Sequence, residues 1–258
     1  MESAEEWINK YAPSTIKDII GSTRQIEGIT YWLNNYEKNK SAYLQTTAKK
    51  TGKKNRKRKV DIETVSDNEE ETKPQKKRNN DSNIYSSMLL YGDNGCGKTC
   101  LIKAILTELN YDVKFANLAK IGKSINTFIE KTLYSESVYD IIKNIQKKKQ
   151  AVIVDDIESI TKTSEKKTLI GLLRTNNDLW ACPLIFIGST KHKKIINIIK
   201  KDTYNVAIYE PRHTDMMRLF VKISENENMM FMDETIAHKL ISHSQSDYRR
   251  MISILQEL

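Results

Sequence analysis

The segment Gly92-Asp93-Asn94-Gly95-Cys96-Gly97-Lys98-Thr99 constrains this chain more than any other feature. It has the spacing Gly-x-x-x-x-Gly-Lys-Thr, follows a short apolar run at residues 87–91, and precedes a helical pattern at residues 98–109. In that context the glycines let backbone N–H groups converge on a phosphate, and the helix N-terminus adds partial positive charge. Lys98 would reach the β- and γ-phosphates and act in catalysis, and the Thr99 hydroxyl would bind Mg²⁺. The motif predicts ATP and Mg²⁺ as cofactors. A chance match in an ordinary strand–helix turn is the alternative.

Two carboxylates follow a second apolar run, Val152-Ile153-Val154-Asp155-Asp156. An apolar run of this kind is typical of a strand that is buried on both faces. A carboxylate at the end of such a strand would hold the metal, so Asp155 is the predicted Mg²⁺ ligand. Asp156 is the candidate for orienting the attacking water. The alternative is an acidic strand end that caps the next helix.

Two further positions are candidate catalytic residues. Ser189 and Thr190 end a third apolar run, residues 184–187, where a small polar side chain can contact the γ-phosphate or the attacking water. Ordinary helix capping is the alternative for both. Arg249, in Ser246-Asp247-Tyr248-Arg249-Arg250, can reach back to the γ-phosphate from a C-terminal helix. Without other evidence, Arg249 is equally consistent with a solvated charge on a helix surface.

The order of apolar runs and helical patterns predicts an α/β fold. Strands and helices alternate between residues 84 and 210, with helices expected at 121–133, 136–148 and about 164–174, which implies a parallel sheet flanked by helices. After Pro211 the pattern becomes helical only, at about residues 213–226, 233–243 and 246–257, which predicts a small helical lid domain over 211–258. Residues 1–45 would hold an N-terminal segment and a first helix at 22–39. Residues 46–83, which hold few apolar side chains, would be a disordered insert or long loop.

Composition narrows the class of protein. The formal net charge is +9, and residues 49–81 supply +5 of it through twelve Lys and Arg against seven Asp and Glu. This balance is compatible with a nucleic-acid partner or with a solvated surface and a basic insert. The basic clusters of the insert are open to interpretation as a nuclear-import signal or as solubilising charge. No apolar run has membrane-spanning length, and three cysteines without a Cys-x-x-Cys pair indicate free thiols.

The N-terminal segment Glu6-Trp7-Ile8-Asn9-Lys10-Tyr11-Ala12-Pro13, followed by Ile16-Lys17-Asp18-Ile19-Ile20-Gly21, closely resembles the opening box of the clamp-loader ATPases of the replication factor C family, within the AAA+ class. The resemblance extends through residues 92–99, 152–156, 209–212 and 247–250. It implies a P-loop AAA+ domain with a helical lid. It also implies that Tyr11, Pro13, Ile19 and Ile20 line an adenine pocket. Arg249 would be the second sensor, and Ser189 or Thr190 the first.

Within that family the chain is most similar to the large subunit. It carries the insert before the P-loop strand, and residues 174–182 lack the Ser-Arg-Cys finger motif of small subunits. The resemblance then implies a site that needs an Arg from an adjacent subunit. Three departures stand out: Asp156 replaces the usual Glu, residues 117–120 only loosely match the family, and the chain stops after the third lid helix, without a collar.

The resemblance predicts an ATP-hydrolysing subunit of a DNA sliding-clamp loader. The implied partners are other loader subunits, a sliding clamp and primer-template DNA, with no membrane, in the nucleus or at a viral replication site. Candidate DNA contacts are the basic residues near helix starts: Lys120, Lys123, Lys162, Lys166 and Lys167. A helicase loader, initiator or repair ATPase is one alternative. A nucleotide-binding scaffold that does not hydrolyse ATP is the other.

Overall fold

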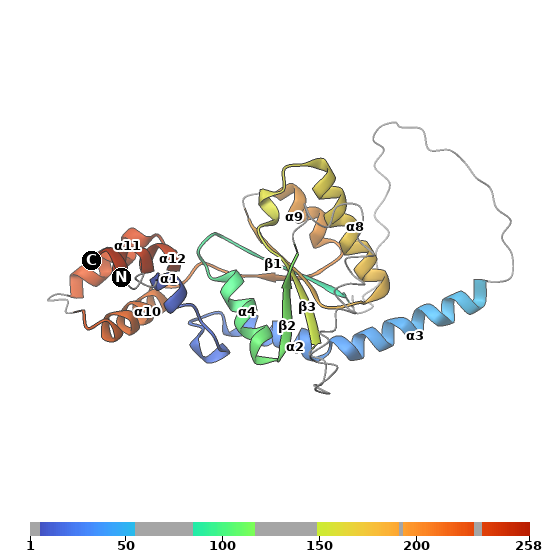
Figure 1. Cartoon of the computed structure of the whole chain (residues 1–258), viewed down its shortest axis with the longest axis horizontal. Helices are drawn as coiled ribbons and strands as arrows, with labels where there is room; N and C mark the ends of the chain where they lie inside the picture. The colour runs from blue at the N-terminus through green and yellow to red at the C-terminus, as the bar shows by residue number, and fades with distance from the viewer. Residues whose placement is uncertain (1–5, 55–84, 117–148, 191–192, 230–233) are drawn as a thin grey trace, which may run out of the picture. The chain divides into compact units, whose positions relative to one another are not determined.

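A five-stranded sheet forms the centre of the fold (Figure 1). The computed structural model describes residues 6–54, 85–116, 149–190, 193–229 and 234–258. The strand order is β2-β3-β4-β1-β5, and every pairing is parallel. The strands are β1 (Ser87–Gly92), β2 (Tyr111–Phe115), β3 (Lys149–Val154), β4 (Leu184–Ser189) and β5 (Tyr204–Ala207). The parallel sheet predicted from the alternation of strands and helices is therefore confirmed.

The central strands are apolar because both of their faces are covered. In β3 the four residues from Ala151 to Val154 are at most 1% exposed, and every residue of β4 is buried. Parallel strands need helical crossovers, and the crossovers place helices on both faces of the sheet. Here α8 (Thr163–Leu179) and α9 (Lys193–Lys200) lie on one side, and α2 (Thr23–Asn34) and α4 (Lys98–Glu108) on the other (Figure 1).

The face under α8 and α9 holds a continuous hydrophobic cluster. Phe186 from β4 packs there with residues such as Leu172 of α8 and Ile199 of α9, all at most 1% exposed. Strands β3 and β4 both contribute residues to this cluster, and their carboxyl ends carry the predicted site residues. Helix α8 extends beyond the predicted 164–174 as far as Leu179. It ends there because the next residue, Trp180, adopts the left-handed conformation, with φ at 50°.

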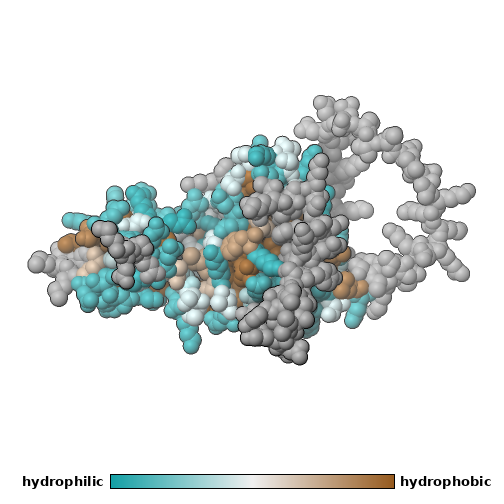
Figure 2. Space-filling model, viewed as in Figure 1, coloured by the Kyte–Doolittle hydropathy of each residue, from teal (hydrophilic) through white to brown (hydrophobic). Residues whose placement is uncertain are grey.

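Three helices follow the sheet: α10 (His213–Asn226), α11 (Glu234–Ser244) and α12 (Tyr248–Glu257). Their apolar side chains form a separate cluster, which includes Phe220, Ile223 and Met251. The outer surface of these helices shows mainly hydrophilic residues (Figure 2). Helix α12 is capped by Asp247, whose carboxylate accepts from the N–H of Arg250 at 3.0 Å.

The contacts divide the chain into two compact units, Met1–Asn34 with Tyr85–Leu258, and Asn35–Ile84. The second unit contains α3 (Tyr36–Lys54), so the helix predicted at 22–39 is interrupted at Asn35. Helix α3 also extends into the range 46–83, which we expected to lack regular structure. That expectation rested on the lack of apolar periodicity. Such periodicity predicts a helix with one buried face, but a segment without it can still form a helix.

Several predicted segments lie outside the described residues. They are the basic clusters of the insert, the loosely matching stretch 117–120, and the helices expected at 121–133 and 136–148. Within the ranges that the structure does describe, no helix combines the length and the apolar character that a membrane span requires.

Candidate nucleotide-binding site

The loop between β1 and α4 has the geometry that its glycines predict. Gly95 and Gly97 have φ values of 74° and 86°, in the left-handed region that other residues rarely adopt. Gly97 is the N-cap of α4. Gly92 is needed for another reason: a Cβ there would lie well within 3.0 Å of the backbone carbonyl of Ile208, which cannot move aside. The loop therefore turns tightly at the N-terminus of a helix, where an anion is favoured.

Lys98 is enclosed by its own loop. Its side chain is 9% exposed, and Nζ donates to the carbonyl oxygens of Gly92 at 3.1 Å and Asp93 at 2.7 Å. A buried ammonium group needs such acceptors, because burial without them carries a large cost. These bonds hold the charge at the loop, where phosphate oxygens can replace the carbonyls. Cys96 completes the turn, since its thiol donates to the carbonyl of Asp93 at 2.9 Å, and burial raises the pKa of that thiol.

Thr99 and Asp155 meet at the predicted metal site. The Thr99 hydroxyl, at the start of α4, donates to Asp155 Oδ2 at 2.9 Å, just past the end of β3. Octahedral Mg²⁺ has ligands at about 2.0–2.1 Å, so two adjacent ligand oxygens lie about 2.9 Å apart. The observed pair fits that spacing. In the described part of the chain, no group of three or more His, Cys, Asp or Glu could hold a metal ion. The pair therefore suits a Mg²⁺ that also binds phosphate and water.

Asp156 lies beside Asp155 in a strained conformation. Its φ and ψ are 55° and 46°, in the left-handed region, and its N–H donates to Asp155 Oδ1 at 2.9 Å. A non-glycine residue held in this region costs roughly 1–3 kcal/mol, and such strain is often found at functional sites. The side chain of Asp156 is exposed at the carboxyl end of the sheet. It is available to solvent beside the proposed metal ligand.

The end of β4 lies against the phosphate loop. Ser189 pairs in register with Gly92 and is buried, and the Thr190 hydroxyl donates to the Asp93 carboxylate. The Thr190 side chain therefore contacts the phosphate loop, and both residues remain candidates for the first sensor. Sequence reasoning missed Glu158, whose carboxylate accepts from the N–H of Ser189 at 3.1 Å. A single sequence cannot predict this contact of Glu158, because it depends on η2 (Ile157–Ser159), which turns the Glu158 side chain toward β4.

One pocket, of about 170 Å³, brings together three distant segments of the chain. The N-terminal segment contributes all four residues of the expected adenine pocket, the phosphate loop contributes residues 95–99, and α12 contributes Arg249. The predicted residues in its wall are Tyr11, Pro13, Ile19, Ile20, Gly95, Cys96, Gly97, Lys98, Thr99 and Arg249. The sequence did not single out the other apolar wall residues, which include Ile8, Leu101, Leu219, Tyr248 and Ile252. The remaining site candidates, Gly92, Asp93, Asn94, Asp155, Asp156, Ser189 and Thr190, are not part of this wall.

The start of α12 is in direct contact with the phosphate loop. The N–H of Tyr248 donates to the carbonyl of Gly95 at 3.2 Å, and the Asp247 carboxylate packs on the Gly95 backbone. The Tyr248 hydroxyl donates to the carbonyl of Ile20 at 3.2 Å. Burial, followed by the charge of Asp215, raises the pKa of Tyr248, so it remains a donor. Arg249 follows directly and is exposed.

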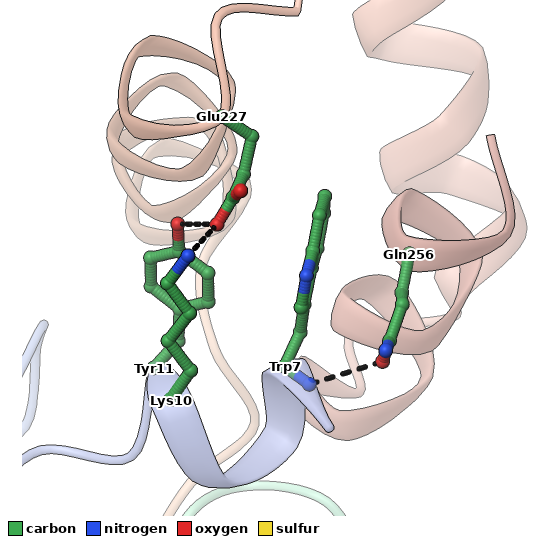
Figure 3. Close-up of polar contacts among 5 residues, drawn as sticks. All are labelled: Trp7, Lys10, Tyr11, Glu227 and Gln256. Atoms are coloured by element: carbon green, nitrogen blue, oxygen red, sulfur yellow. Dashed lines mark hydrogen bonds and ion pairs between the residues drawn. The ribbon is translucent and has the colours of Figure 1, made fainter. Parts of the chain in front are cut away.

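The N-terminal segment is fixed at both ends. The helix α1 (Trp7–Lys10) and Tyr11 bind the C-terminal helices through Gln256 and Glu227 (Figure 3). Further along, η1 (Ile16–Asp18) is held by the N–H of Ile16, which donates to Glu108 Oε2 of α4 at 2.8 Å. The segment therefore bridges α4 and the C-terminal helices, and the pocket lies along it.

The structure describes three of the five lysines predicted to contact DNA. Lys162, Lys166 and Lys167 are exposed at the start of α8, and Lys162 lies 3.7 Å from Glu165, whereas Lys120 and Lys123 lie outside the described residues. In the stretch that lacks the finger motif, Asn176 is buried and donates to the carbonyl of Cys182 at 3.0 Å. That part of the stretch therefore has a structural role.

Comparison with known proteins agrees with these features. Residues 88–212 match the family AAA, described as the ATPase family associated with various cellular activities. It is similar to a protein of Acanthamoeba polyphaga mimivirus that bears the name replication factor C large subunit, at 25% identity over 100% of this chain and 48% of the relative. Replication factor C subunit 1 of Saccharomyces cerevisiae is 20% identical over 100% of this chain and 27% of its own length. The replication factor C large subunit of Methanococcus vannielii is 20% identical over 98% and 42%.

The resemblance to replication factor C that the sequence indicated is thus confirmed, at low identity. The chain spans between 27% and 48% of the length of these three relatives. Among solved structures, one described as the crystal structure of a DNA replication initiation factor aligns with 67% of this chain and 54% of its own, at 12% identity and a TM-score of 0.47.

Proposed function

We propose that the chain is an ATP-binding and ATP-hydrolysing subunit of a DNA sliding-clamp loader, similar to the large subunit of replication factor C, acting in DNA replication. The observation that carries this proposal is the pocket in which the N-terminal segment, the phosphate loop and Arg249 meet. A phosphate loop alone is common to many nucleotide-binding proteins. The replication factor C large subunits match this chain along almost its whole length, including the N-terminal segment.

In this proposal each part of the site has one task. The loop N–H groups and Lys98 bind the triphosphate, and the apolar wall that includes Tyr11 and Ile19 takes the base. Thr99 and Asp155 hold Mg²⁺, which neutralises charge on the phosphates. Asp156 orients the attacking water, and Ser189 or Thr190 is the first sensor; the contact of Thr190 with Asp93 supports Thr190. Arg249 would sense the γ-phosphate from α12.

The proposed partners are other loader subunits, a sliding clamp and primer-template DNA. The finger arginine would come from an adjacent subunit, so turnover would depend on assembly. DNA contact through Lys162, Lys166 and Lys167 would be mainly to phosphates, and binding should weaken steeply as salt rises. The site of action would be the nucleus, or a viral replication site for a viral protein.

The test is ATP turnover by the chain mixed with loader subunits, sliding clamp and primed DNA. We expect turnover that requires the partners and is lost in Lys98→Ala. The matched control is Lys103→Ala, which removes an exposed charge from the same helix. Turnover no higher than that of Lys98→Ala in every combination of partners would refute hydrolysis. It would favour a nucleotide-binding scaffold, an alternative that is compatible with Asp156 in place of the longer glutamate.

A second candidate is an initiator-type ATPase of DNA replication. An ORC1-type DNA replication protein of Methanocorpusculum labreanum is 22% identical over 66% of this chain and 50% of its own length. Retention of the chain on an immobilised sliding clamp distinguishes the two, because a clamp loader must bind the clamp. Failure to bind any clamp while binding origin DNA would favour the initiator.

A further inference from the structure

Glu227 joins the N-terminal segment to the C-terminal helices. One of its carboxylate oxygens, Oε1, accepts hydrogen bonds from two consecutive residues, the Lys10 ammonium at 2.6 Å and the Tyr11 hydroxyl (Figure 3). Tyr11 is one of the wall residues of the pocket, whereas Glu227 is not. The carboxylate therefore holds a wall residue from outside the pocket.

The position of Glu227 is set by the end of a helix. It is the C-cap of α10, and its N–H donates to the carbonyl of Ile223 at 3.0 Å. Its side chain is 18% exposed and that of Lys10 is 43% exposed, so Lys10 alone would hold the carboxylate loosely. The Tyr11 hydroxyl adds a second, more directional bond to the same oxygen.

The protonation states suit this arrangement. The hydrogen bond from Lys10, followed by that from Tyr11, holds the pKa of Glu227 below its usual range, so the group accepts as a carboxylate. Burial, with the bond to Glu227 and its charge, raises the pKa of Tyr11 to about 12. The phenol therefore stays a donor at every physiological pH.

Glu227 acts on Tyr11 more than on the segment as a whole. The backbone of the segment has other anchors: the Trp7 N–H donates to Gln256 Oε1 at 3.0 Å, and the Ile16 N–H to Glu108. The Tyr11 ring packs edge-on against Trp7, with centroids 6.0 Å apart and planes at 75°. That contact fixes one edge of the ring. At the other end the hydroxyl donates to Glu227, and the side chain of Asn226 is a second, weaker hydrogen-bonding partner there.

We infer that Glu227 is a positioning residue for the base side of the nucleotide pocket. By holding the hydroxyl of Tyr11 it keeps the ring in the wall against which the base lies. It contributes nothing to the binding of phosphates, which lie at the loop. This inference rests on the proposed function, because it requires that the pocket takes the base of ATP.

The experiment compares ATP with inorganic tripolyphosphate, which carries the phosphates but no base. Both affinities are measured on the full chain by competition with a fluorescent ATP analogue. We expect Glu227→Ala and Tyr11→Phe each to weaken ATP about fivefold, the effect of one lost hydrogen bond, and to leave tripolyphosphate within about twofold. Glu227→Gln, which keeps an acceptor, should recover most of the loss.

Glu225→Ala is the matched control, because it removes an exposed carboxylate from the end of the same helix. It should change neither affinity. A merely structural role for Glu227 would weaken both ligands together, and that result, or unchanged ATP binding in the Glu227 variants, overturns the inference. If Glu227→Ala fails to fold, Glu227→Gln and Tyr11→Phe decide. A wild-type chain that binds neither ligand refutes the proposed function and the inference with it, whereas failure of the inference alone leaves wild-type ATP binding intact.

Discussion

Replacing Gly95 by alanine tests whether α12 truly packs on the phosphate loop. The added Cβ has two separate costs at this position. The first is conformational, since φ is 74° and a non-glycine residue there costs about 1–2 kcal/mol. The second is steric, because the Cβ would lie well within 3.0 Å of the Asp247 carboxyl atoms.

Relief of that clash requires Asp247 to move. Movement would break the bond from the Arg250 N–H, at 3.0 Å, which caps α12, and losing such a cap costs about 1 kcal/mol. It would also disturb the bond from the Tyr248 N–H to the Gly95 carbonyl. The free energy of unfolding should therefore fall by about 2–4 kcal/mol in total, which lowers Tm by about 2–4 °C for each kcal/mol in a chain of this size.

Gly97→Ala separates the two costs. Its φ of 86° carries the same conformational strain, but the nearest atom to its Cβ is Tyr248 Cδ2, at an ordinary 3.9 Å. Thermal and urea unfolding without nucleotide should show Gly95→Ala about 1–2 kcal/mol less stable than Gly97→Ala. The difference should disappear when Asp247→Ala is present in both. Equal destabilisation of the two single variants would refute the contact between α12 and the loop.

The remaining predictions concern the ligands and the pH response. Lys98→Ala should weaken ATP about 100-fold, or about 2.7 kcal/mol, by calorimetry, while Lys103→Ala changes it less than about threefold. Asp155→Asn should bind ATP equally well with Mg²⁺ or with a chelator, whereas the wild type binds more tightly with Mg²⁺. The tyrosinate absorbance that Tyr11→Phe removes should appear near pH 12. Because this raised pKa favours the neutral phenol, its contribution to stability is complete below about pH 10 and is lost as pH rises toward 12.

Each of these has a clear contrary result. Similar losses in the two lysine variants would mean that charge alone, and not the buried position of Lys98, governs ATP binding. A Mg²⁺ effect that survives in Asp155→Asn would move the metal away from the pair with Thr99. Ionisation of Tyr11 near pH 10 would mean that the hydroxyl is free of Glu227 in solution.

Much of the fold could be predicted because its signals are local. The apolar run ending at Val154 is buried on both faces, as its composition requires, and the glycines at 95 and 97 have the backbone conformations that their spacing suggested. The parallel sheet followed from the alternation of strands and helices. The prediction did not foresee that α3 continues to Lys54, through residues that carry no apolar period.

What the sequence could not give were contacts between segments far apart in the chain. Glu158 meets Ser189, and Glu227 meets Tyr11, through turns at the ends of η2 and α10 that place each carboxylate. A single sequence shows no pattern for either pair, because the partners lie far apart in the chain and meet only when the elements between them have folded. The contact between Thr190 and Asp93 is likewise one that the sequence could not predict.

The sequence by itself therefore determined the phosphate loop, the buried strands and the carboxylate after β3, because glycine conformation, burial and charge act within a few residues. Only the tertiary structure decided that residues 8–20, the loop and α12 share one pocket, and which polar side chains hold its walls. These contacts depend on the packing of α1 and α12 around a common apolar cluster, and packing of that kind is a property of the folded chain.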